Sequence, residues 1–179
     1  MRHTRREVRF ISELIDRLQS QYNIDSNRIY ANGMSNGGGM AFALSCKLSD
    51  RIAAVKTVAA ELALPWDRCG YSKPVPTIVF HATADKFAPY QGGKSPITPR
   101  PLANVLDWAA DVAQRTQCKA GPIDTRVSPS VRRLAYTNCA EKADVILYTI
   151  EGEAIPGRAA NTWRNGSPGA RPTKSMRRA

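Results

Sequence analysis

The segment RIYANGMSNGGGMAFALSC (residues 28–46) decides the fold. Its first part, residues 28–33, is short, partly β-branched and ends in glycine, which indicates a buried strand. From Asn36 onward the segment is apolar and rich in helix formers after its glycines, which predicts a helix. Between strand and helix stands Gly33-Met34-Ser35-Asn36-Gly37, which matches the pattern G-x-S-x-G.

This pattern has a chemical rationale. A serine on a tight strand-to-helix turn exposes its hydroxyl, and we expect Gly33 and Gly37 to let the backbones approach without a Cβ clash. The Asn36 N–H would then supply half of an oxyanion hole. We therefore predict that Ser35 is a nucleophile, and a glycine-rich turn without catalytic role is the alternative.

Outward from this segment, apolar periodicity predicts helices and strands in alternation. Residues 7–21 form an amphipathic pattern, and residues 102–113 predict a second helix, opened by Pro101 in its first turn. Residues 52–60, 77–80 and 145–150 resemble buried strands. The alternation implies an α/β fold, with a parallel sheet covered by helices on both faces. We expect one domain over residues 7–152 and an aperiodic, disordered basic tail over residues 153–179.

An acid and a base are needed to activate a serine. In a triad that runs Ser, Asp/Glu, His along the chain, Asp85 follows a later strand and is the expected acid. An ordinary aspartate in a surface loop is the alternative. The chain holds only two histidines, His3 and His81, and both precede Asp85. We expect His81 to be structural, so the triad is incomplete as written.

The net charge of +11 suggests a nucleic-acid binder, but its distribution does not. Residues 1–9 hold four arginines against one glutamate, and residues 153–179 hold six basic residues against one glutamate. The charge excess therefore lies mainly at the ends, and we expect neither a nucleic-acid nor a membrane partner. No apolar run reaches the length of a membrane span, and the first ten residues lack the apolar core of a signal peptide.

Four cysteines, Cys46, Cys69, Cys118 and Cys139, show no spacing typical of metal ligands. In a secreted protein they would form two disulfides in one of three connectivities, and four reduced thiols are the alternative. We expect no metal and no cofactor.

Three segments resemble the secreted polyhydroxybutyrate depolymerase and feruloyl esterase-like family of α/β-hydrolases. They are residues 28–46, PVPTIVFHATADKFAPYQGG (residues 74–93) and VILYTIEG (residues 145–152), within a resemblance that covers residues 7–152. The resemblance implies an extracellular esterase with Ser35 as nucleophile, Asp85 as acid and a Cys118–Cys139 bridge, and we expect Cys46 to pair with Cys69. Ala82 stands where the family has glycine, and the ester could be a polyester, a feruloylated sugar or a short acyl ester.

The chain departs from this family at both ends. It begins at the helix before the strand that leads to Ser35, so we expect a truncated domain that lacks the second oxyanion donor. We also expect the backbone of residues 29–31 to form an open sheet edge that favours self-association. EGEAIPGR (residues 151–158) stands where the family carries its histidine motif. Permitted codons read from the third base of codon 153 give S-H-T-W-P-G-G-E-H-L-A-E-W-I, so we expect an out-of-frame tail. We expect little esterase activity, and a non-catalytic binding module is the alternative.

Overall fold

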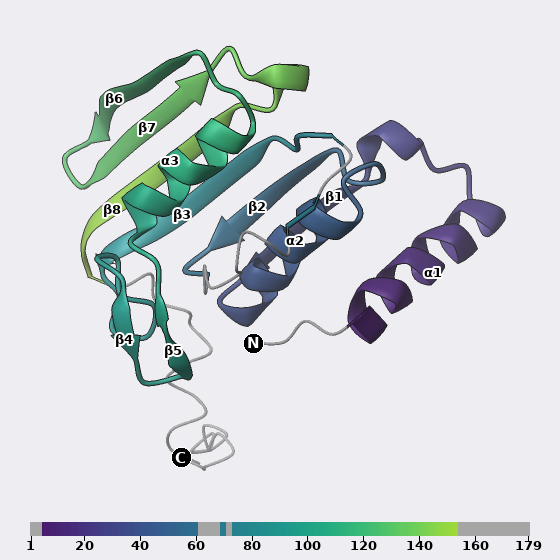
Figure 1. Ribbon diagram of the computed structural model, residues 1–179, viewed down its shortest axis with the longest axis horizontal. Helices are drawn as coiled ribbons and strands as arrows, with labels where there is room; N and C mark the ends of the chain where they lie inside the picture. Colours follow the sequence, from purple (N-terminus) through teal and green to yellow (C-terminus); the bar gives the residue numbers. More distant parts are fainter. Residues whose placement is uncertain (1–4, 61–68, 71–72, 154–179) are drawn as a thin grey trace, which may run out of the picture.

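The computed structural model describes residues 5–60, 69–70 and 73–153 of the chain. Within this part, a six-stranded sheet has the strand order β1-β2-β3-β8-β7-β6 (Figure 1). The first four of these strands are mutually parallel, whereas β7 and β6 run antiparallel to their neighbours. The bounds are β1 Tyr30–Met34, β2 Ala54–Val58, β3 Thr77–Ala84, β6 Ala120–Ser128, β7 Val131–Thr137 and β8 Val145–Glu153.

Helix α1 precedes the strands, and the other α-helices lie between them in the chain. The α-helices in the described part of the chain are α1 Arg5–Gln21, α2 Asn36–Lys47 and α3 Val105–Arg115, and the same residues hold the 3₁₀ turns η1 Ser26–Arg28 and η3 Ala140–Lys142. A separate hairpin joins β4 Gly93–Ser95 to β5 Thr98–Leu102. No helix among the described residues is long and apolar enough to cross a membrane.

The predicted start of α3 is wrong. The Asn104 side chain caps the helix by accepting from the backbone N–H of Leu106 and Asp107, so the helix begins at Val105. Asparagine is a favoured N-cap residue because its side chain satisfies amides of the first turn. Pro101 instead lies in β5, where the absence of an N–H is tolerated in a two-stranded hairpin.

The expected parallel sheet is found in part, because β7 runs antiparallel to β8 and β6 runs antiparallel to β7. All nine residues of β6 are exposed or half-buried, so neither face of this strand gives the apolar signal by which sequence patterns reveal strands. Its pairing with β7 nevertheless runs from Ala120–Thr137 to Ser128–Val131.

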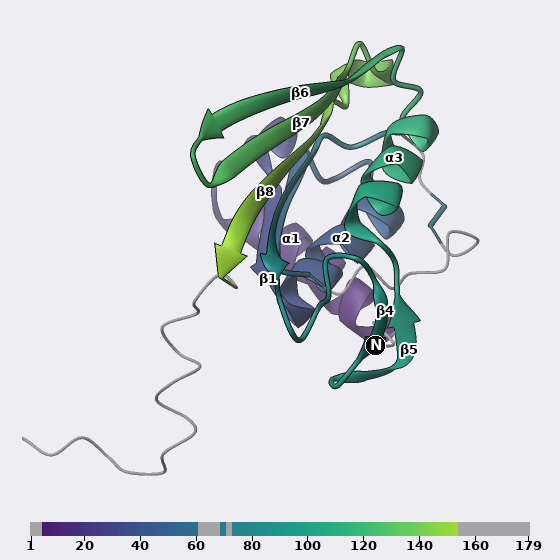
Figure 2. The same ribbon diagram turned by 90° about the vertical axis from the view of Figure 1, so that its left-hand side faces the viewer.

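The core lies between the sheet and one layer of helices (Figure 2). Phe42 of α2 and Trp108 of α3 meet edge to face, with 4.7 Å between ring centroids. Beneath them, Val79 of β3 and Leu147 of β8 are fully buried. The contact of α1 with this layer is smaller, and Ile15 is its one buried residue.

The opposite face of the sheet is different. Ile78, Phe80, Ile146 and Tyr148 alternate with the buried residues of β3 and β8 and are half-buried. Among the described residues, α2 and α3 both pack on the other face, so the expected layer on this second face is not found there. The apolar pattern had predicted two covered faces because both sides of these strands carry large apolar residues.

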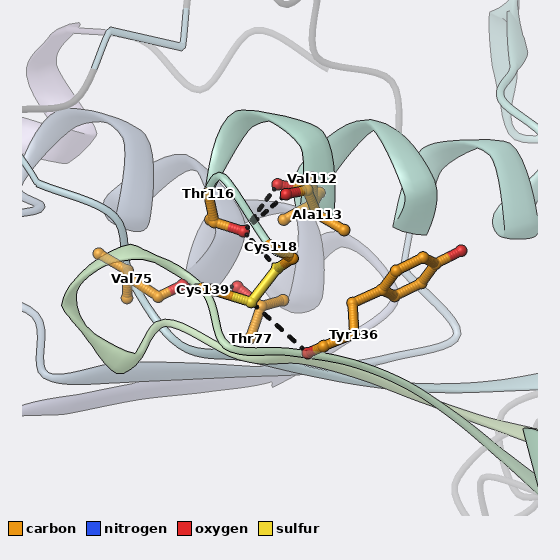
Figure 3. Close-up of a disulfide and its surroundings, with 8 residues drawn as sticks. All are labelled: Val75, Thr77, Val112, Ala113, Thr116, Cys118, Tyr136 and Cys139. Carbon is orange, nitrogen blue, oxygen red and sulfur yellow. Dashed lines mark hydrogen bonds between the residues drawn. A yellow bond between two sulfur atoms is a disulfide. The ribbon is translucent and has the colours of Figure 1, made fainter. Parts of the chain in front are cut away.

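Two disulfides join the ends of helices α2 and α3 to segments between strands. Cys118, just after α3, bonds Cys139, just after β7, close to the Thr116 hydroxyl (Figure 3). Cys46 of α2 bonds Cys69, so the described residues contain no free cysteine and the expected disulfide bonding is confirmed. His3 and the predicted tail beyond Glu153 lie outside the described residues.

Candidate active site

Ser35 occupies the turn between β1 and α2 in a strained backbone conformation, φ 53° and ψ −123°. A non-glycine residue at positive φ costs on the order of 1–3 kcal/mol and persists only where the surroundings fix it. Here the Ser35 N–H donates to the Val58 carbonyl at 2.8 Å, and the Gly39 N–H donates to the Ser35 carbonyl at 3.1 Å. The ends of the strand and the helix thus hold this residue from both sides.

Close backbone contact explains two of the glycines around Ser35. A Cβ on Gly33 would lie 2.3 Å from the Gly37 carbonyl carbon, and one on Gly38 would lie 2.7 Å from the Ala60 Cβ. A Cβ on Gly37 would meet no atom within 4 Å. The expectation that Gly37 is needed for close approach is therefore wrong, and Gly38 takes that role. Sequence reasoning missed Gly38 because a run of three glycines does not tell which one is in contact.

Asn36 is the first residue of α2, directly after Ser35. The amides of a helix's first turn have no acceptor within the helix, so this end of α2 offers donors and the positive end of the helix dipole. The Asn36 N–H is one of these donors and directly follows Ser35.

Asp85 follows β3 directly, and its side chain is only 8% exposed, which excludes an ordinary surface aspartate. Its Oδ1 accepts from the backbone N–H groups of Phe87 and Ala88, both at 2.9 Å. These bonds fix the carboxylate in its loop. Its Oδ2 lies 4.0 Å from the nearest histidine nitrogen, too far for a hydrogen bond.

That nitrogen is Nε2 of His81, which donates to the Ala88 carbonyl at 2.7 Å. The His81 side chain is 1% exposed, and burial lowers its pKa, so the ring is neutral at neutral pH. Its Nδ1 is buried without a partner. His81 lies in β3, and its buried ring is bonded to the carbonyl of Ala88 in the following loop, so it does not reach a serine after β1 and is structural.

Parallel strands bring these residues to one edge. Ser35 follows β1 and Asp85 follows β3, with only β2 between them, and neighbouring strands are about 4.8 Å apart. The next strand, β8, ends at the same edge, where Glu153 pairs with Ala84 and the Gly152 N–H donates to the Thr83 hydroxyl at 3.2 Å. The chain therefore leaves β8 beside Asp85.

The chain is similar to proteins named as esterases. It is 31% identical to "Feruloyl esterase B" of Piromyces equi over 156 residues, which are 82% of this chain and 28% of that protein. It is 26% identical to "Putative esterase NocK" of Nocardia uniformis subsp. tsuyamanensis over 183 residues, 93% of this chain and 51% of that protein.

A third relative is "Bifunctional acetylxylan esterase/xylanase XynS20E" of Neocallimastix patriciarum, 28% identical over 86 residues, 48% of this chain and 12% of that protein. The chain thus spans about half, or less, of the length of these relatives. No protein-family model matches it.

Proposed function

We propose that this chain carries part of the catalytic domain of a serine carboxylic-ester hydrolase with the α/β-hydrolase fold, of the feruloyl or acetyl esterase type. The observation that carries the proposal is the strained backbone of Ser35 between a parallel strand and a helix. This geometry supports a nucleophile elbow, a turn that exposes the serine hydroxyl above the carboxyl edge of a sheet. The esterase names of the relatives support the same chemistry.

In the proposed reaction, the Ser35 Oγ attacks the ester carbonyl while its proton passes to a general base. The Asn36 N–H stabilises the oxyanion, the alcohol leaves with the proton, and an acyl-enzyme remains. Water then attacks the acyl group, releases the carboxylic acid and regenerates the serine. Asp85 orients and stabilises the base through Oδ2, because Oδ1 is occupied by the backbone of its own loop.

The base of this reaction is a histidine that the chain as written does not provide. Loss of one triad member costs roughly four to six orders of magnitude in turnover. We therefore propose that the chain retains little activity. The two disulfides further support an extracellular, oxidising compartment.

Two other functions are alternatives to this proposal. A polyester depolymerase would share the mechanism and differ only in substrate. A non-catalytic binding module is favoured by the state of His81, whose Nε2 is bound to Ala88 and whose ring is buried. Chemical rescue of the missing base distinguishes a binding module from an esterase.

The experiment supplies the missing base as free imidazole. The purified chain is incubated with p-nitrophenyl acetate with and without imidazole, and acylated protein is followed by intact mass and peptide mapping. We expect imidazole to accelerate acetylation of Ser35, and Asp85→Asn to reduce the gain. Ser35→Ala should abolish the adduct, while the exposed Ser20, replaced by alanine, serves as the matched control.

Acetylation that is unchanged in Ser35→Ala would refute the nucleophile assignment. Labelling of Ser35 that imidazole does not accelerate would favour the binding module. A second protein, with S-H-T-W-P-G-G-E-H-L-A-E-W-I replacing the chain after Gly152, should turn over the ester without imidazole.

A further inference from the structure

A serine on the β4–β5 hairpin bonds to the loop that carries Asp85. The Ser95 hydroxyl donates to the Phe87 carbonyl at 2.6 Å and accepts from the Ile97 N–H at 3.2 Å. Its single proton is therefore committed to Phe87, because a carbonyl oxygen can only accept. This hydrogen bond links the separate two-stranded sheet to the loop that follows β3 (Figure 1).

The bond from Ser95 reaches Asp85 through one peptide group. The carbonyl of Phe87 and the N–H of Ala88 belong to the same planar peptide unit. Its oxygen accepts from Ser95, while its N–H donates to Asp85 Oδ1 at 2.9 Å. Hydrogen bonds in such a chain polarise and strengthen one another, above all where water is excluded. The Asp85 side chain is largely buried, so the Ser95 hydroxyl both orients and strengthens a donor to the carboxylate.

The next peptide group of this loop is held by His81. Its Nε2 donates to the Ala88 carbonyl at 2.7 Å, from a fully buried ring. The ring meets Tyr90 edge to face, with 5.9 Å between centroids, and the Tyr90 hydroxyl is bonded to the Thr149 hydroxyl of β8 at 2.7 Å. Side chains from β3 and β4 thus hold two successive carbonyls of the loop, and the β3 side chain packs against a ring anchored to β8.

These two anchors determine where the free oxygen of Asp85 points. Oδ1 accepts both backbone donors, so the direction of Oδ2 depends on the position of the peptide groups at residues 86–88. We propose that Ser95 is a positioning residue which, together with His81, fixes the Asp85 loop so that Oδ2 faces a catalytic base. The catalytic consequence rests on the proposed function, whereas the anchoring of the loop does not.

The anchoring is tested by amide hydrogen exchange, followed by NMR in the full chain. Ser95→Ala should raise the exchange rate of the Ala88 amide about fivefold, as expected for one lost hydrogen bond, and Ser95→Thr, which keeps the hydroxyl, should restore it. Ser20→Ala is the matched control, because the Ser20 hydroxyl also donates to a backbone carbonyl, that of Arg17, at 2.7 Å. An unchanged rate in Ser95→Ala, or no restoration by Ser95→Thr, overturns the anchoring.

The positioning role is tested in the imidazole-rescued acetylation of Ser35. Ser95→Ala should remove most of the gain that Asp85→Asn removes, and Ser95→Thr should return it. Added to Asp85→Asn, Ser95→Ala should slow acetylation no further, because both changes act through the same carboxylate, whereas a general loss of structure would slow it again.

Failure of this inference and failure of the proposed function give different results. A full Asp85-dependent gain in Ser95→Ala overturns the positioning role, even if the exchange rates change. No imidazole rescue in the parent chain refutes the proposed function and with it the catalytic role of the loop. The exchange rates of the Ala88 amide decide the anchoring by Ser95 separately, since they require no reaction.

Discussion

The ring of Phe80 stacks on the ring of Tyr148, with 4.9 Å between their centroids and 7° between their planes. The two residues are register partners on β3 and β8, and both lie on the sheet face opposite α2 and α3. Half-buried Ile78 and Ile146 precede them on the same face. An apolar ladder thus crosses the centre of the sheet on a face that the described helices leave open.

This face ends at β1, the edge strand, where Tyr30 is 61% exposed. An open apolar edge can pair with another chain, and we predict concentration-dependent self-association, measured by light scattering after size exclusion. Tyr30→Lys should reduce it because charge on an edge strand disfavours pairing. Tyr22→Lys, at an equally exposed tyrosine outside the sheet, should not. A monodisperse monomer at high concentration would contradict the prediction.

The glycines of the elbow should differ sharply in tolerance. Gly33→Ala places a methyl group 2.3 Å from the Gly37 backbone and should cost more than about 2 kcal/mol in the free energy of unfolding. Gly37→Ala should change that energy by less than about 0.5 kcal/mol, because its Cβ meets nothing. Urea unfolding measures both, and equal destabilisation would show that the elbow is packed differently.

The disulfides should contribute measurably to stability. Cys118 and Cys139 are 21 residues apart, and a loop of this length corresponds to about 3 kcal/mol in the chain-entropy model. The double variant Cys118→Ser, Cys139→Ser should therefore unfold at lower urea than the parent chain. Non-reducing peptide mapping of protein made in an oxidising compartment should recover both bridges; four free thiols there would contradict the assignment.

His81 should make stability depend on pH. Burial lowers its pKa in the folded state below the unfolded value of about 6.5, so the unfolded chain binds the proton more tightly. The contribution of the neutral ring to the free energy of unfolding is fully present above about pH 6.5. It falls as the pH drops toward the folded-state pKa. Between about pH 7.5 and about pH 5.5, the parent should lose more stability than His81→Gln. Equal losses would assign the pH dependence to other groups.

The reading frame after β8 is open to direct test. Because Glu153 pairs with Ala84, β8 ends beside the residue that precedes Asp85, and a histidine supplied shortly after β8 would serve the proposed triad. We predict that sequencing the gene will reveal an insertion or deletion near codon 153. A clean sequence encoding EAIPGRAAN, shared by close relatives, would overturn the frameshift and favour the binding module.

Sequence patterns predicted the parallel half of the fold because its strands and helices carry strong apolar periods. The segment that decides the fold became β1 and α2, with the predicted helix 7–21 beside them as α1. Strand β6 was not predicted because all its residues are exposed or half-buried and give no apolar alternation. The start of α3 was misplaced because Pro101 suits both a helix's first turn and a hairpin, and only the Asn104 cap decides between them.

The candidate site, like the fold, was predictable from the sequence only in part. Ser35 and Asp85 follow from the order of motifs along the chain, and the structure places both at the carboxyl edge of parallel strands. The bond from His81 to Ala88 could not be foreseen, since it joins residues whose approach depends on how the Asp85 loop folds back.

The two disulfides lie at the end of the molecule away from Ser35. Cys46 is near the end of α2, Cys118 follows the end of α3, and Cys139 precedes β8, all toward the amino ends of the parallel strands. Neither bridge therefore joins the turn that holds Ser35 or the loop that holds Asp85. Loop grafting at that edge, to exchange one ester preference for another, would leave both covalent links and the packing around them in place.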